Sequence, residues 1–199
     1  MLGHDYTRRH NEALKCIHLT LCNKYGIKKS KKLRCYSVQE VVANENVEIR
    51  VDTRIKTDVK IKHDRPDLFV YDKKNREITL IEVGITNLDL LTQVENEKLR
   101  KYDLIANELA MMYKCRVKII PYVMTWDGIV TKCHKKYVAD IGIQPKIEAY
   151  IQSLVLRKTL ESLSFERRRG LEEEDQREKL EAISNRLVQD GDVVDIKAA

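Results

Sequence analysis

Two short apolar runs joined by a polar stretch constrain the fold of this chain more than any other feature. Residues 67–71 (DLFVY) and 78–83 (ITLIEV) are rich in β-branched and aromatic side chains, and residues 72–77 between them are mostly polar. This pattern predicts a β-hairpin. A two-residue turn at Lys74-Asn75 would place Asp67 directly opposite Glu82, with the two backbones roughly 5 Å apart.

The two acids of this hairpin form a candidate metal site. Carboxylates so close on an apolar surface repel each other unless a cation lies between them, and oxygen ligands of this kind favour Mg2+ or Mn2+. Apolar residues flank Glu82 on both sides, which favours an inward-facing acid. The alternative is that Glu82 begins a loop or lies at an exposed edge. The same-face geometry survives a register shift of two residues but not of one.

The spacing of apolar residues predicts the other elements. They are a helix over 7–25 ended by Gly26, a strand over 47–55, a helix over 89–113, a strand over 116–124 with a turn at 126–128, a short basic helix over 132–139 and a helix over 147–163. This order predicts an α/β core over residues 1–165. The very polar residues 171–187 predict an exposed helix or a partner-binding arm within a charged tail over 166–199.

Composition excludes several classes. With 43% apolar and 34% charged residues but only 7 Gly and 3 Pro among 199, the chain is neither disordered nor collagen-like, and an all-β sandwich is disfavoured. The five cysteines are odd in number and no signal peptide pattern precedes them, so we expect reduced thiols in an intracellular protein. No apolar run approaches the roughly 18 residues of a membrane span, so we expect solubility. Cys16, His18 and Cys22 have no ordinary zinc spacing and are interpreted as core residues.

Basic clusters indicate a polyanion partner. The net charge is +6, and a solvated helix face explains any single cluster, but several in one chain favour nucleic acid. We expect nucleic-acid phosphates to contact two of the clusters. These are Lys28, Lys29, Lys31, Lys32 and Arg34, and Lys132, Lys135 and Lys136.

A lysine interrupts the apolar stripe of the predicted 89–113 helix. The stripe consists of Leu91, Val94, position 98, Tyr102, Ile105, Leu109 and Met112, and position 98 is a lysine. Lys98 either extends to the surface or points at a partner charge in a site. The helix follows the Glu82 strand directly, so its first turns can reach the acidic pair.

An ordered series of motifs covers about four fifths of the 199 residues. Its members are Arg9-His10, Thr57-Asp58, Arg65-Pro66-Asp67, Leu80-Ile81-Glu82-Val83, Lys98 with Lys101-Tyr102, Ile119-Ile120-Pro121, Gly128 with Thr131-Lys132, and Lys135-Lys136-Tyr137 before the 147–163 helix. The series resembles the restriction-endonuclease-like superfamily, with its PD-(D/E)XK pattern. Within that superfamily it is most similar to the C-terminal endonuclease domain of site-specific LINE-type (non-LTR) retrotransposons.

The resemblance implies a restriction-endonuclease-like mixed sheet flanked by helices, and a nuclear Mg2+- or Mn2+-dependent endonuclease. Such an enzyme cuts or nicks double-stranded DNA during target-primed retrotransposition. This chain lacks a reverse transcriptase, so we expect an excised domain of a larger polyprotein, a fragment or a stand-alone relative. The rival hypotheses are a catalytically inactive nuclease fold that binds DNA or protein, and a junction-resolving or repair nuclease.

The resemblance also assigns roles. Asp67, Glu82 and the Val83 carbonyl would hold a metal that polarises the phosphate and activates water. The superfamily lysine is expected two positions after Glu82, where this chain has Gly84. In the retrotransposon branch that lysine is displaced onto the next helix, which implies Lys98, with Lys101 as the reserve candidate.

Four further residues have open interpretations. Tyr102 would orient Lys98 or touch the DNA backbone, or is a core tyrosine. Asp58 is an added metal ligand or a turn-capping acid. His10 is structural or contacts phosphate. Asn11 stands where this retrotransposon group usually has Asp.

Overall fold

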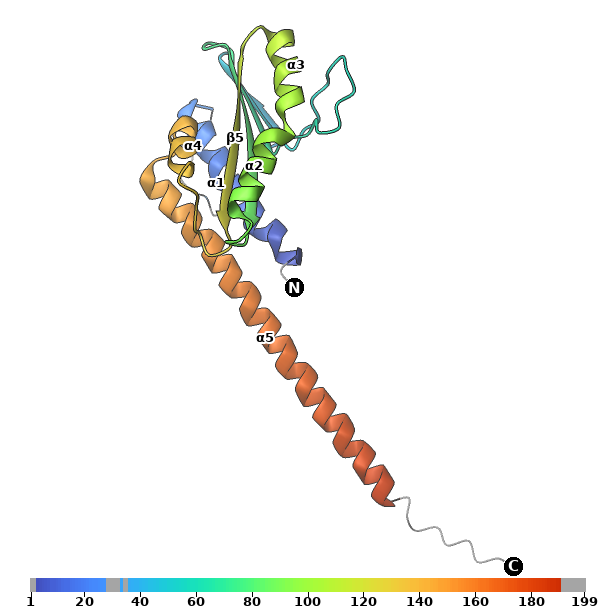
Figure 1. Ribbon diagram of the computed structural model, residues 1–199. Coiled ribbons are helices and arrows are strands. Elements are labelled where there is room, and N and C mark those ends of the chain that lie inside the picture. The colour runs from blue at the N-terminus through green and yellow to red at the C-terminus, as the bar shows by residue number, and fades with distance from the viewer. Residues whose placement is uncertain (1–2, 28–32, 34–35, 191–199) are drawn as a thin grey trace, which may run out of the picture. The chain divides into compact units, whose positions relative to one another are not determined.

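The computed structural model describes residues 3–27, 33 and 36–190, and the side chains of 6–27, 33, 36–165, 167 and 168. Along the chain, one helix is followed by four strands, two helices, a fifth strand and two more helices in the described residues (Figure 1). The elements are α1 (Gly3–Lys24), β1 (Val41–Ala43), β2 (Val47–Val51), β3 (Leu68–Asp72), β4 (Glu77–Thr86), α2 (Leu91–Lys101), α3 (Asp103–Tyr113), β5 (Arg116–Thr125), α4 (His134–Ile141) and α5 (Pro145–Asp190).

The strands form one mixed sheet in the order β1-β2-β3-β4-β5. The strands β1 to β4 pair antiparallel with one another, and β5 lies parallel to β4. A parallel pair needs a crossover connection, which α2 and α3 supply here. The predicted α/β class with a mixed sheet flanked by helices is therefore correct.

The predicted hairpin is β3 and β4, and its register is the predicted one. Leu68 pairs with Ile81, and Asp67 and Glu82 are the next residues along the two segments, at the start of β3. The predicted turn is wrong in detail, because the loop has four residues, 73–76, centred on the expected two. The Asp72 side chain accepts hydrogen bonds from the backbone and side-chain nitrogens of Asn75, both at 2.8 Å, and holds this longer loop closed.

Two predictions about the neighbouring strands need correction. The predicted 47–55 strand ends at Val51, because Asp52 adopts the left-handed conformation with φ 48°, which no strand can continue. The edge strand β1, only three residues long, was not predicted because a segment this short carries no recognisable alternation.

The single helix predicted over 89–113 is two helices. At Tyr102 the backbone leaves the helical conformation, with φ −108° and ψ 10°, so that α2 ends before it and α3 starts after it. In the predicted stripe, Leu91, Tyr102, Ile105 and Leu109 are buried, Val94 and Lys98 are half-buried, and Met112 at the end is exposed. An unbroken helical pattern in the sequence hides such a break, since both halves bury the same face.

The sheet separates two apolar clusters. On one face, α1, α4 and the first turns of α5 pack against odd-numbered β4 residues such as Ile81 and Val83. On the other face, α3 and Tyr102 pack against even-numbered residues such as Ile78 and Leu80. Side chains alternate along a strand, so Glu82 and Gly84 belong to the second face.

The chain divides into two compact units, Met1–Thr159 and Leu160–Ala199. The predicted helix over 147–163 and the polar residues 171–187 both lie in one continuous helix, α5. The predicted stripe of this helix is buried from Ile151 to Thr159, whereas Leu163 is exposed. None of the helices in the described residues is both long and apolar enough to span a membrane.

Candidate active site

Strand pairing brings Asp67 and Glu82 together. Asp67 is the residue before β3, and Glu82 lies in the middle of β4. The Asp67 backbone nitrogen lies 3.4 Å from Glu82 Oε2, and the Val83 backbone N–H donates to Asp67 Oδ2 at 2.8 Å. The Glu82 side chain is only 5% exposed, so the alternative of an exposed edge acid is wrong.

Glu82 is surrounded by donors from α2 and the α2–α3 junction. Lys98 Nζ donates to Glu82 Oε1 at 3.1 Å and Lys101 Nζ donates to the same oxygen at 2.7 Å. The Tyr102 hydroxyl lies 2.8 Å from Oε2. Lys98 therefore points at a partner charge instead of extending to the surface. The two ammonium groups supply the positive charge that a buried carboxylate requires.

Gly84 provides the space for Lys98. A Cβ atom at position 84 would lie 2.7 Å from Lys98 Cε and 3.1 Å from Val123 Cγ2. Real Cβ atoms essentially never come as close as the 2.7 Å to Lys98 Cε, so a side chain on the strand here and the present path of Lys98 exclude each other. The glycine on the strand therefore allows the lysine of the helix to follow this path.

His10 joins the site from α1, which we did not predict. Its Nε2 donates to Asp67 Oδ2 at 3.0 Å, and the Tyr6 ring stacks on the imidazole with a centroid distance of 5.7 Å. The only sequence signal was its place in the Arg9-His10 motif. Because His10 is distant from Asp67 in the chain, periodicity gave no indication that the two residues meet.

The His10–Asp67 pair shifts both pKa values. Burial by itself raises the pKa of Asp67, but the hydrogen bond and charge of His10, the Val83 N–H and Lys98 together lower it below the usual 3.8. Burial by itself lowers the pKa of His10, but the hydrogen bond and charge of Asp67 raise it above 6.5. Both shifts favour an ion pair of carboxylate and imidazolium.

The Tyr102 hydroxyl connects the acid to the preceding loop. It lies 2.9 Å from the Arg65 carbonyl oxygen and 2.8 Å from Glu82 Oε2, and it has one proton to donate. Burial raises its pKa, and the Glu82 charge and hydrogen bond raise it further, so the hydroxyl stays protonated and donates. Tyr102 is thus more than a core residue, because it fixes the Glu82 carboxylate.

The donors at this centre suit a hard divalent cation. Asp67, Glu82 and the adjacent Val83 carbonyl offer oxygen atoms alone, the ligand type that Mg2+ prefers. Both hydrogen bonds to the Asp67 carboxylate described above involve Oδ2. A cation at Glu82 Oε1 would have to share this atom with Lys98 and Lys101, or displace one of them. In the described part of the chain, no three His, Cys, Asp or Glu side chains form a ready metal-binding group.

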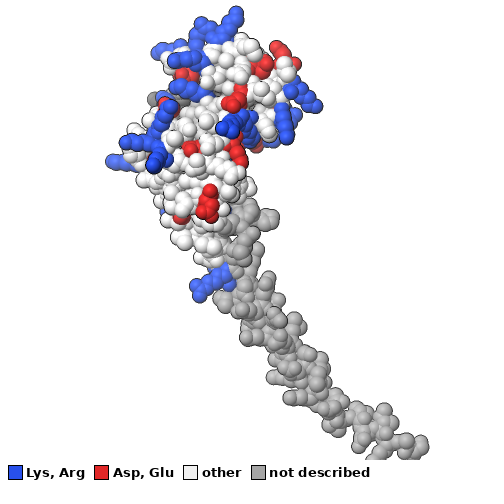
Figure 2. Space-filling model, in the orientation of Figure 1, with Lys and Arg blue, Asp and Glu red and all other residues white. Residues whose placement is uncertain are grey.

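The other predicted residues lie apart from this centre or outside the described residues. Asp58 is exposed in the loop between β2 and β3, and the hydrogen bonds around Asp67 and Glu82 do not include it. Lys132, which precedes α4, and Lys135 and Lys136 on α4 are exposed. Lys28, Lys29, Lys31, Lys32 and Arg34 lie outside the described residues. Figure 2 shows Lys and Arg side chains in several separate groups on one face.

The cysteines near His18 are core residues, as predicted. Cys16 and Cys22 are buried in the first cluster with α1. His18 is buried as well, and its Nδ1 lies 2.6 Å from the Tyr36 hydroxyl oxygen.

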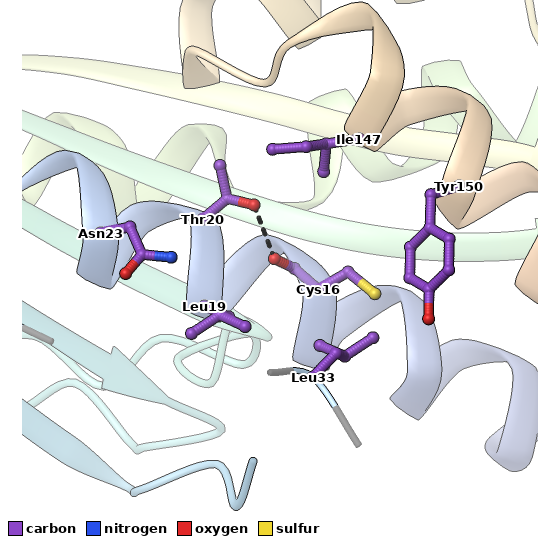
Figure 3. Close-up of a pocket in the computed structure, with 7 residues that line it drawn as sticks. All are labelled: Cys16, Leu19, Thr20, Asn23, Leu33, Ile147 and Tyr150. Atoms are coloured by element: carbon purple, nitrogen blue, oxygen red, sulfur yellow. Dashed lines mark hydrogen bonds between the residues drawn. The ribbon is translucent and has the colours of Figure 1, made fainter. Parts of the chain in front are cut away.

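A separate pocket of about 220 Å³ lies between α1 and the first turns of α5 (Figure 3). Its wall is mainly apolar, and it includes Leu19, Ile147 and Tyr150, while the Thr20 hydroxyl is bound to the Cys16 carbonyl at 2.8 Å. None of its lining residues belongs to the Asp67–Glu82 centre.

Comparison with known proteins assigns no family. No protein-family model and no curated protein matches the chain. Among solved structures, an N-terminal domain of a reptarenavirus L protein resembles it with a TM-score of 0.35 and 13% sequence identity, over 73% of this chain and 66% of that one. A match at this level identifies neither the fold nor the function.

Proposed function

We propose that this chain is a metal-dependent DNA endonuclease with a restriction-endonuclease-like core. Its active centre consists of Asp67, Glu82 and Lys98, with Lys101 and Tyr102 beside them. The observation that carries the proposal is the position of Lys98. Its ammonium lies 3.1 Å from the second acid of a carboxylate pair, and its stem crosses the strand position at which the superfamily pattern has lysine.

Each residue has a separate task in phosphodiester hydrolysis. Asp67, Glu82 and the Val83 carbonyl would hold Mg2+ or Mn2+, which would polarise the phosphate and lower the pKa of an attacking water. Lys98 stabilises the charge that develops on the phosphate or the attacking hydroxide. Tyr102 and His10 act through the acids, because Tyr102 fixes Glu82 and His10 keeps Asp67 ionised. Lys101, the more exposed lysine, neutralises Glu82 in the absence of metal.

The substrate in this proposal is double-stranded DNA, nicked or cut within the nucleus during retrotransposition. Support comes from the motif series that resembles LINE-type retrotransposons and from the net charge of +6. In this setting the chain acts as part of, or as a relative of, a larger reverse-transcriptase polyprotein.

Nicking of a supercoiled plasmid tests the proposal. With Mg2+ or Mn2+ the chain should convert supercoiled DNA into the nicked form, and with a chelator it should not. Asp67→Asn, which retains the shape of the side chain but removes its charge, should abolish the conversion. Plasmid that stays intact with either metal would overturn the proposal.

A preference for branched over linear DNA distinguishes the rival class, a junction-resolving or repair nuclease, from the proposed enzyme. A junction-resolving or repair enzyme would cleave a four-way junction or flap much faster than a linear duplex of the same sequence. The proposed enzyme should show no such preference. Metal-independent binding without any cleavage would instead support an inactive binding module.

A further inference from the structure

The segment between β2 and β3 is a long loop that ends at the active site. Residues 52–67 contain no helix or strand, and the last of them is Asp67. Loops longer than about 12–15 residues without regular structure are uncommon in compact domains and are usually functional. In Figure 1 this loop extends from the sheet close to α3.

The base of the loop is fixed. The Asp52 backbone N–H donates to the Asp67 carbonyl at 3.0 Å, and the Ile55 N–H donates to the Asp64 carbonyl at 2.8 Å. Ile55 is 4% exposed and packs in the cluster that contains Tyr102, and Ile61 packs against the same cluster. Residues 56–63 therefore form a tip on an ordered base, held from one side by Ile61.

The charges of the loop are divided between base and tip. At the base, Arg65 pairs with Asp52 at 2.8 Å and Arg54 pairs with Asp64 at 3.2 Å, so the acids there are neutralised. The tip carries Lys56, Lys60 and Lys62 against Asp58, all of them exposed, which gives a net charge of +2 (three minus one). At the corresponding edge of Figure 2, basic side chains stand out from the surface.

We infer that the tip of this loop binds phosphates of duplex DNA beside the cleavage site. The inference rests on the proposed endonuclease function, since Asp67 at the end of the loop defines where the scissile phosphate lies. Excess positive charge on exposed side chains complements a phosphate backbone. Lys60 and Lys62 flank Ile61, which packs against the second cluster, and both lysines are exposed.

The reach of the loop sets the position of the contact. Lys60 stands seven positions before Asp67 (67 minus 60), so its Cα lies within roughly 25 Å of the Asp67 Cα. Phosphates of one strand follow each other at about 3.4 Å along the helix axis. The tip therefore reaches phosphates within about seven nucleotides of the cut.

Salt dependence of DNA binding provides the test. The full chain with chelator present is titrated onto a fluorescent duplex at a series of salt concentrations, so that binding is measured without cleavage. Lys60→Gln with Lys62→Gln should flatten the slope of log affinity against log salt by about 2, at roughly 0.9 per lost phosphate contact. Arginine at both positions should restore the slope, because the contact is one of charge.

The matched control is Lys73→Gln with Lys74→Gln. These two exposed lysines lie in the β3–β4 loop, at the opposite end of β3 from Asp67, and their loss changes the net charge equally. The control should retain the wild-type slope. Both variants should unfold at the wild-type temperature, since all four side chains are exposed.

The outcomes distinguish a failure of the loop inference from a failure of the proposed endonuclease function. An unchanged slope for the Lys60 and Lys62 variant, or an equal flattening in the control, overturns the inference even if the wild-type chain nicks DNA with Mg2+. The inference is also overturned if the Lys60 and Lys62 variant loses affinity for single-stranded RNA while its binding of duplex DNA is unchanged. A flattened slope in a chain that cleaves nothing supports the loop as a DNA contact and removes the proposed enzymatic function.

Discussion

The Lys98 side chain occupies the space beside Glu82 that a side chain at Gly84 would fill. The Lys98 stem crosses the strand so closely that a methyl group on residue 84 would lie 2.7 Å from Cε. The ammonium at the end of that stem reaches Glu82 Oε1 at 3.1 Å. The lysine of the site therefore comes from α2, and the strand retains a glycine that makes room for it.

Gly84→Ala should destabilise the chain and displace Lys98. The expected cost is about 1–3 kcal/mol of unfolding free energy, as in other overpacked sites. In a Lys98→Ala background the same change should cost much less, because its main collision partner is gone. Urea unfolding of the four chains in this double-mutant cycle measures the coupling. Equal costs in both backgrounds would mean that Lys98 does not occupy this space.

Glu82→Gln should destabilise the metal-free protein. Two ammonium groups then lose their counter-charge, at a cost of up to about 3 kcal/mol, reduced to the extent that both lysines reach water. Repulsion between Asp67 and Glu82 alone would make the loss of one charge stabilising. The opposite is expected here, because the two lysines already neutralise Glu82. Urea unfolding in a chelator measures the change. Glu97→Gln on the exposed side of α2 is the control and should cost less than about 0.5 kcal/mol. A Glu82→Gln variant as stable as the control would contradict the buried ion pairs.

The His10–Asp67 pair should give a window of pH-dependent stability. The raised pKa of His10 means that its contribution is complete below 6.5 and is lost as pH rises through the folded value. The lowered pKa of Asp67 means that its contribution is complete above 3.8 and is lost as pH falls through the folded value. Stability from the pair is therefore greatest between these two values.

Substitution of His10 checks this window. His10→Asn should reduce the unfolding free energy by about 1–2 kcal/mol near pH 5.5 and by less at pH 9. Chemical unfolding across this pH range gives the difference. The same substitution at the exposed His63 should leave the profile unchanged. A His10→Asn deficit that is constant with pH would show that the imidazole has only a packing role.

The two lysines on Glu82 should differ in kinetics. Lys98→Ala should bind duplex DNA nearly normally but cleave it on the order of a hundredfold more slowly, since its charge acts on the transition state. Lys101→Ala should lose less activity, because this side chain is 32% exposed, against 17% for Lys98. Single-turnover rates with saturating enzyme separate cleavage from binding. The reverse order of losses would assign the role to Lys101.

The hairpin and the face of the site were predictable because they depend on local patterns. The β-forming runs 67–71 and 78–83 predicted the hairpin, and the assumed turn at Lys74-Asn75 gave the register. The four-residue loop found in the structure is centred on the same two residues, so the register is preserved. Helical spacing on the following segment placed Lys98 on the buried stripe. The break at Tyr102 was not predictable, because the backbone departs from the helix without a glycine or proline to indicate it.

Contacts between elements that are distant in the chain could not be predicted from the sequence pattern. Periodicity orients a residue within its own helix but not toward another element, so the His10–Asp67 contact and the packing of Ile55 under the basic loop were missed. The expected metal-ligand role of Asp58 gained no support, because that residue lies on an exposed loop tip. The reason for glycine at position 84 likewise appears only when the path of a helix side chain over the strand is known.

Moving the lysine from α2 to position 84 of the strand tests the central claim most directly. Single-turnover plasmid nicking is compared for the wild-type chain, Lys98→Ala, and the double variant Gly84→Lys with Lys98→Ala. We predict Mg2+-dependent nicking by the wild-type chain, a loss of about a hundredfold in Lys98→Ala, and partial recovery when position 84 supplies the ammonium to the same space. Wild-type nicking rates in Lys98→Ala, or a wild-type chain that does not nick DNA with Mg2+, would contradict an active centre of Asp67, Glu82 and Lys98.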